Sequence, residues 1–143
     1  IVCTTLEKED DGIVEIARKE NVRYFRGSVK DKLVRWKEAC EEHNITKFIS
    51  IDADDPFFDK DLSFRSISQL EDGYDLVKHC EYQPNHGFYE GCVGYAIKLD
   101  IIQEACKIKE TDDTEMMWSF IEKVPDVKIG TLNAEKIKTK FPI

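Results

Sequence analysis

Hydrophobic residues follow two alternating patterns along the chain, short apolar runs and stripes at helical spacing. The apolar runs predict strands at 1–5, 22–25, 47–52, 74–78, 95–99 and 127–132. The helical stripes predict helices that begin near 10 and 31 and helices over 62–71, 101–107 and 113–123. This alternation of strand and helix predicts βαβ units, and therefore an α/β fold.

The apolar faces of the first two helices can be assigned from the spacing. The first helix has Asp10 or Asp11 as its cap and carries Ile13, Ile16 and Ala17 on one face. The second helix carries its apolar face at Leu33, Trp36, Ala39 and Cys40.

Two further segments differ from each other in how regular their hydrophobic pattern is. The nearly unbroken apolar run of Phe48, Ile49 and Ile51 predicts a strand that is buried on both faces. The polar and aromatic stretch that follows the next strand contains several Gly and Pro residues, which predicts an irregular excursion around 79–97. Since no linker composition appears, 1–143 is predicted to be a single α/β domain, incomplete at both ends.

Composition excludes some partners. The 143 residues include 29 acidic and 21 basic ones, and the resulting net charge of -8 repels a nucleic-acid backbone. A small phosphorylated ligand remains possible, because a metal ion or a few local cations can hold phosphate. No apolar run is long enough for a membrane span. The five cysteines are widely separated and lack a Cys-x-x-Cys pair, so we expect them to be reduced and buried in a cytoplasmic protein.

An acidic turn follows the third predicted strand. Asp52, Asp54 and Asp55 lie where ligands bind in an open α/β sheet, beyond the carboxyl ends of the strands. If the chain stays extended, Asp52 and Asp54 point the same way and offer two oxygen ligands to Mg²⁺. Asp is also a common turn former, so one of these residues could instead cap the following helix.

A second candidate site follows the second predicted strand. Arg26, Gly27 and Ser28, with Asp31 in the first turn of the next helix, could meet an anionic ligand. The same residues also form an ordinary helix entry. In the irregular segment, His86 and Tyr89 are candidate sugar contacts, because binding residues often lie in such loops.

Two stretches carry a resemblance, VRYFRGSVKDKLVRW at 22–36 and ISIDADDPFFD at 49–59. Together they resemble the spore-coat-polysaccharide and acylneuraminate type of cytidylyltransferase, whose members read V-x-x-F-R-G-S, then D-x-L-x-R-aromatic, and later G-D-x-P. The start of the chain, with Asp10 and Asp11, resembles their V-A-T-T and D-D segment. Two looser similarities are also present. Residues 94–97 resemble a G-x-Y-x-Y strand of related enzymes, and residues 114–118 resemble an E-H-V region of the family.

The resemblance implies a fold and an activity. The fold is the Rossmann-like, three-layer, mostly parallel sheet of the nucleotide-diphospho-sugar transferases. The activity joins a sugar or sugar acid to CTP with Mg²⁺ and releases pyrophosphate. The resemblance also suggests a homodimer.

The resemblance implies roles for individual residues. Asp54 takes the place of the catalytic metal-binding Asp of G-D-x-P, and Asp52 is a supporting metal ligand. The residues implied for the nucleotide are Arg26, Gly27, Ser28 and Asp31. Those implied for the sugar substrate are Tyr95 and Glu115, beside the loop candidates His86 and Tyr89.

The sequence departs from the family pattern in three places. The Gly-rich loop that grips the triphosphate is expected before Ile1, and a second metal-binding Asp is expected after Ile143. Ala53 stands where the family has Gly, which adds a methyl group near the phosphates.

Two other functions stay open. One is guanylyl or other nucleotidyl transfer to a sugar phosphate, which the matched motifs allow. The other is a Mg²⁺-binding α/β module without catalysis, of the receiver kind. Receiver-type chains carry paired acids after their first strand, whereas this chain has Thr4 and Thr5 there.

Without the triphosphate loop, residues 1–143 alone are expected to be inactive. Incubating them with CTP, Mg²⁺ and a panel of sugar acids should release no pyrophosphate above the buffer control. Vigorous release would show that the chain already contains a complete active site.

Overall fold

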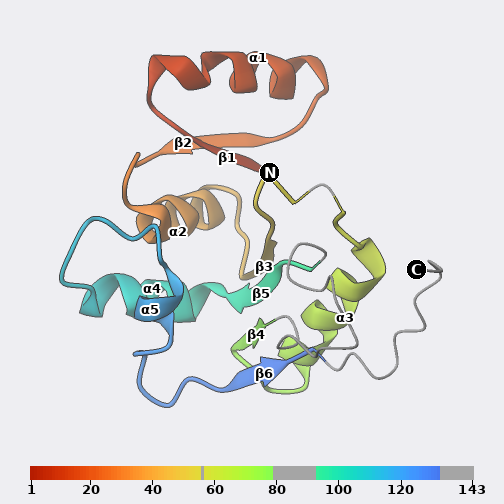
Figure 1. Ribbon diagram of the computed structural model, residues 1–143, viewed down its shortest axis with the longest axis vertical. Helices are drawn as coiled ribbons and strands as arrows, with labels where there is room; N and C mark the ends of the chain where they lie inside the picture. The colour runs from red at the N-terminus through yellow and green to blue at the C-terminus, as the bar shows by residue number, and fades with distance from the viewer. Residues whose placement is uncertain (56, 79–92, 133–143) are drawn as a thin grey trace. The chain divides into compact units, whose positions relative to one another are not determined.

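The computed structural model of the protein describes residues 1–55, 57–78 and 93–132, which fall into two compact units (Figure 1). The first unit joins Ile1–Thr46 to Leu99–Asp126, and the second joins Lys47–Lys98 to Val127–Ile143. A single domain over the whole chain therefore stays a prediction.

The first unit is built on two parallel strands. β1 (Val2–Thr5) pairs with β2 (Tyr24–Gly27), and Thr5 lies opposite Gly27 at their carboxyl ends. The connection contains a short 3-10 turn, η1 (Lys8–Asp10), and α1 (Asp11–Lys19). This is the βαβ unit that the alternating pattern predicts.

Three further helices complete the first unit. Figure 1 shows α2 (Lys32–Glu42) and α1 on opposite sides of the β1–β2 pair. α4 (Leu99–Ile108) packs against α2, and the short α5 (Trp118–Ile121) contacts α4. The α2 face is buried as predicted, at Leu33, Trp36, Ala39 and Cys40.

The predicted apolar face of α1 is partly wrong. The buried residues are Val14 and Ala17, whereas Ile13 and Ile16 are 43% and 64% exposed. The apolar stripe of this helix is wide, and its burial is confined to one narrow line of side chains. Spacing alone does not say which edge of such a stripe is buried.

The second unit is a four-stranded mixed sheet in the order β3-β5-β4-β6. These strands are β3 (Lys47–Ser50), β5 (Tyr95–Lys98), β4 (Leu76–Lys78) and β6 (Ile129–Thr131). β5 runs antiparallel to both neighbours, while β4 and β6 are parallel. Three of the four strands therefore share one direction, with β5 reversed.

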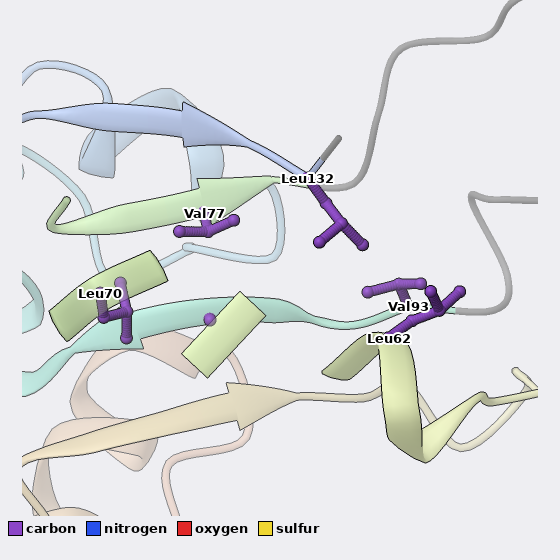
Figure 2. Packing of buried hydrophobic residues seen from close by; sticks show 6 residues of the cluster. Leu62, Leu70, Val77, Val93 and Leu132 are labelled. Atoms are coloured by element: carbon purple, nitrogen blue, oxygen red, sulfur yellow. The ribbon is translucent and has the colours of Figure 1, made fainter. Parts of the chain in front are cut away.

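One helix supplies the core of this sheet. α3 (Lys60–Glu71) packs against β3, β4 and β5. Figure 2 shows its side chains meeting those of the strands in a hydrophobic cluster. The buried members are Leu62, Leu70, Val77, Val93, Ala96 and Leu132. Burial of such side chains contributes about 1.5–3 kcal/mol each and holds the sheet to the helix.

Two predictions about the second unit need correction. β3 is only half-buried, and the following Ile51 is 44% exposed, so burial of this run on both faces is wrong. Within the described residues β3 is an edge strand with β5 as its neighbour, which explains the exposure. Tyr95–Ile97 belong to regular β5 rather than to an irregular excursion, and 79–92 lie outside the described residues.

The predicted helix over 113–123 is present but much shorter than predicted, because only Trp118–Ile121 is helical. The backbone N–H of Thr114 donates to the Lys30 carbonyl, 3.1 Å away, and its hydroxyl bonds to α2. These long-range bonds hold the start of the segment in turns.

The cysteines differ from one another in exposure. Cys40 is buried and Cys106 is half-buried, but Cys3 is exposed, so the prediction of burial fails there. Successive side chains of a strand point to opposite faces, and the buried one at this point is Thr4. Among the described residues, no helix has the length and apolar character to cross a membrane.

Gly94→Ala should destabilise the protein by about 1–3 kcal/mol, the usual range for overpacking. A methyl group there would overlap the Ser50 carbonyl oxygen and lie 2.7 Å from Cγ2 of Ile49. Gly12→Ala is the matched control, because nothing lies within 4 Å of the added methyl. Urea unfolding should show a lower midpoint for Gly94→Ala only, and equal midpoints would contradict the β3–β5 packing.

Candidate functional site

Arg26, near the end of β2, holds the loop that follows β1. Its Nε donates to the Thr5 carbonyl at 2.8 Å, and its Nη2 donates to the Glu7 carbonyl at 2.7 Å. Its Nη1 pairs with the Asp11 carboxylate at 2.7 Å. These bonds use three of the five guanidinium N–H groups. The guanidinium therefore links the carboxyl ends of both parallel strands.

Asp10 orders the same loop from within. Its carboxylate accepts the hydroxyls of Thr4 at 2.6 Å and Thr5 at 2.5 Å, and the Thr5 N–H at 2.8 Å. The hydroxyl of Thr4, followed by the two groups of Thr5, lowers the pKa of the Asp10 carboxyl to about 2. Asp10 occupies the predicted cap position of α1, but its side chain makes no cap bond and instead binds Thr4 and Thr5.

Gly27 and Ser28 form a tight connection to α2. A Cβ at Gly27 would lie 2.7 Å from Cε1 of Phe25 and 3.0 Å from Cγ of Arg35, so a larger residue would force the Phe25 side chain to shift. The Ser28 carbonyl accepts Nη1 of Arg35 at 2.8 Å. The Ser28 hydroxyl accepts the Asp31 N–H at 3.0 Å. The loop between β2 and α2 is therefore held by bonds at both ends.

Asp31 is the N-cap of α2 and is almost completely buried. Its Oδ1 accepts the Val34 N–H at 3.1 Å and the Thr114 hydroxyl at 3.0 Å. Its Oδ2 pairs with Nζ of Lys109 at 2.6 Å. Both carboxylate oxygens are thus bonded within the unit, and the helix-entry interpretation of this motif is confirmed.

Thr114 and Lys109 were not predicted to belong to this site. Thr114 is 83 residues from Asp31 in the sequence, and no spacing rule links them. The carboxylates of Asp112 and Asp31 raise the pKa of Lys109, which keeps its ammonium charged beside the buried Asp31. The sequence signals near these residues were a short polar segment, KETDDT at 109–114, and the loose family similarity of 114–118.

The acidic turn lies in the second unit. The Asp55 N–H donates to the Asp52 carbonyl at 3.1 Å, so the chain turns here and the extended arrangement assumed from sequence is wrong. Asp52 and Asp54 are exposed, and Asp55 is half-buried. Across residues 1–55, 57–78 and 93–132, no group of three or more His, Cys, Asp or Glu side chains is arranged around a metal site.

Helix capping does not explain the acidic turn. Asp59 caps α3, since its Oδ1 accepts the N–H groups of Asp61 at 2.8 Å and Leu62 at 3.0 Å. The interpretation of Asp54 or its neighbours as the cap is therefore wrong. Two exposed carboxylates in one turn match the one or two that Mg²⁺ takes from a protein.

The predicted sugar contacts are scattered. Tyr95 is the first residue of β5 and lies half-buried opposite Ser50 in the second unit. Glu115 is exposed in the first unit, directly after Thr114. His86 and Tyr89 lie outside the described residues.

Comparison with known proteins gives two similarities. The chain is 28% identical over 128 residues to an uncharacterized protein of Methanocaldococcus jannaschii, which covers 89% of this chain and 51% of that protein. A cytidylyltransferase structure from Leptospira borgpetersenii serovar Hardjo-bovis is similar with a TM-score of 0.75 and 22% identity, over 96% of this chain and 58% of that one. No model of a known protein family matches the chain.

These similarities establish the fold. The chain spans about half the length of the curated relative that it matches. The predicted Rossmann-like α/β class is confirmed by the mixed architecture and by the cytidylyltransferase neighbour. The narrower spore-coat-polysaccharide and acylneuraminate type stays a prediction. This chain thus has the α/β fold of a cytidylyltransferase.

Thr4→Val should raise the pKa of the Asp10 carboxyl from about 2 toward its ordinary value of 3.8, because it removes the largest cause of the shift. A carboxyl ¹³C NMR titration measures this. An unchanged pKa would contradict the Thr4 bond.

Because the folded pKa is depressed, the stability that Asp10 contributes is present above about pH 4 and is lost as the pH falls through about 2. The stability difference between the parent and Asp10→Asn should shrink over that window.

Proposed function

We propose that the protein is a nucleotidyltransferase that joins CTP to a sugar or sugar acid with Mg²⁺ and releases pyrophosphate. The observation that supports this most is the position of both sequence motifs on the shared fold. Arg26 and Gly27 end β2 and Ser28 follows it, while the Asp52–Asp55 turn follows β3. Ligands of open α/β sheets bind beyond such strand ends.

The proposed reaction is a displacement at the α-phosphorus of CTP. A sugar oxygen forms the new bond to phosphorus and loses its proton, and the bond from the α-phosphorus to the bridging oxygen breaks. Pyrophosphate leaves with that electron pair. Such a reaction depends on positioning and on stabilisation of the negative charge that develops on the phosphates.

The oxygen donors of the acidic turn fit a Mg²⁺ site. Asp54 would bind Mg²⁺ directly, and Asp52 would support it, because both carboxylates are exposed and Mg²⁺ prefers hard oxygen ligands. When bound, the ion would neutralise phosphate charge and orient the triphosphate.

The nucleotide would lie by the loop between β2 and α2. Arg26 supplies positive charge, and Gly27 lets the backbone pack closely against Arg35. Ser28 supplies a hydroxyl. The buried Asp31 stabilises the loop, because its N–H donates to that hydroxyl. Because the N–H groups of Leu33 and Val34 already donate within the protein, the phosphates would be met by the side chains of Arg26 and Ser28 rather than by the first turn of α2.

Four residues are separate candidates for contact with the sugar substrate, namely the exposed Glu115, the half-buried Tyr95, and His86 and Tyr89 from the segment between β4 and β5. We also propose that the protein acts in the cytoplasm as a homodimer. Guanylyl transfer to a sugar phosphate and metal binding without catalysis are the alternatives that the following measurement separates.

Asp54→Asn should lower the turnover of the full-length protein by at least about 100-fold, because a direct metal ligand is lost while the turn remains. Pyrophosphate release is measured with CTP or GTP, with sugar and sugar-acid acceptors, and with Mg²⁺ present or chelated. Asp72→Asn is the matched control, since Asp72 is an exposed acid at the other end of α3.

The control should keep the parent's rate. Near-normal turnover of Asp54→Asn would refute its assignment as a metal ligand. Release that requires GTP would favour guanylyl transfer, and Mg²⁺ binding without any release would favour the non-catalytic module.

A further inference from the structure

Thr114, which is distant from α2 in the sequence, forms hydrogen bonds with the start of this helix. The Thr114 N–H donates to the Lys30 carbonyl at 3.1 Å. The Thr114 hydroxyl accepts the Leu33 N–H at 3.0 Å and donates to Oδ1 of Asp31 at 3.0 Å. Thr114 is completely buried. The backbone and side chain of this one residue therefore bond three of the four residues from 30 to 33, two of them through the hydroxyl.

Both functions of the Thr114 hydroxyl are needed at once. The Leu33 N–H lies in the first turn of α2, where helix geometry provides no backbone acceptor. Asp31 already accepts the Val34 N–H with the same oxygen that Thr114 approaches. Among residues of similar size, only a hydroxyl side chain donates and accepts in this way.

Lys109 completes the arrangement by matching the charge of Asp31. Its Nζ lies 2.6 Å from Oδ2 of Asp31, and both side chains are at most 10% exposed. The same ammonium bonds Asp112 at 2.6 Å at the surface. A buried carboxylate without such a partner would be strongly unfavourable.

The arrangement extends to the candidate nucleotide loop. The backbone N–H of Asp31 donates to the Ser28 hydroxyl, so the position of the Asp31 backbone orients the Ser28 side chain. Glu115, a candidate sugar contact, follows Thr114 directly in the chain.

We infer that Thr114 and Lys109 are positioning residues that set the nucleotide loop through Asp31 and hold the Glu115 turn to it. This inference rests on the proposed function. The bonds join two stretches that each carry candidate binding residues, so a shift in one would displace the other.

The test compares steady-state pyrophosphate release by the full-length parent, Thr114→Val and Thr114→Ser. Thr114→Val keeps the shape and loses both hydroxyl bonds. We expect its KM for CTP to rise about tenfold, which corresponds to the free energy of about one hydrogen bond. The kcat should change less than about threefold. Thr114→Ser should restore the parent's KM.

Ser66→Ala is the matched control. Ser66 is also a completely buried hydroxyl, but its bond among the described residues is to the Leu62 carbonyl within α3, at 3.3 Å. Its KM for CTP should equal that of the parent. If Thr114→Val lowers the melting temperature but leaves KM unchanged, the positioning role is overturned and only a structural role remains.

Lys109→Gln provides a second test in case Thr114→Val does not fold. It removes the charge beside Asp31 and should also raise the KM for CTP, whereas an unchanged KM would overturn the inference. A parent that neither binds CTP in equilibrium dialysis nor releases pyrophosphate would refute the proposed function, and with it this inference. An active parent with unaffected variants would refute the inference alone.

Discussion

The buried carboxylate of Asp31 is the interaction on which the first unit depends. It caps α2 through Val34, pairs with Lys109 and receives the hydroxyl of Thr114. A charge so deeply buried is stable only if every oxygen is bonded and an opposite charge lies beside it. The need to satisfy Asp31 therefore brings 109–114 to the start of α2 and prevents that segment from forming a longer helix.

The loops at the ends of β1 and β2 follow the same principle. Arg26 and Asp10 bond to backbone and hydroxyl groups of Thr4, Thr5 and Glu7. These bonds turn a loop of several residues into a defined surface at the strand ends. A rigid surface of this kind favours binding, because little conformational entropy is lost when a ligand arrives.

The acidic turn in the second unit contrasts with Asp31. Asp59 provides the cap of α3, and the hydrophobic cluster on α3 and the strands holds that helix in place. Asp52 and Asp54 are exposed and serve neither of these structural purposes. The exposed position of both carboxylates after β3, together with the preference of Mg²⁺ for oxygen ligands, is the reason that the proposed function assigns Mg²⁺ to this turn.

Sequence by itself determined the strands, the helices α2, α3 and α4, the buried face of α2 and the position of both motifs after strands, because these depend on local periodicity and turn chemistry. Only the tertiary structure decided that Val14 rather than Ile13 is buried, that β5 runs against its neighbours and that Thr114 meets Asp31. Those outcomes depend on which surfaces meet across many residues, and a pattern of local spacing contains no information about such contacts.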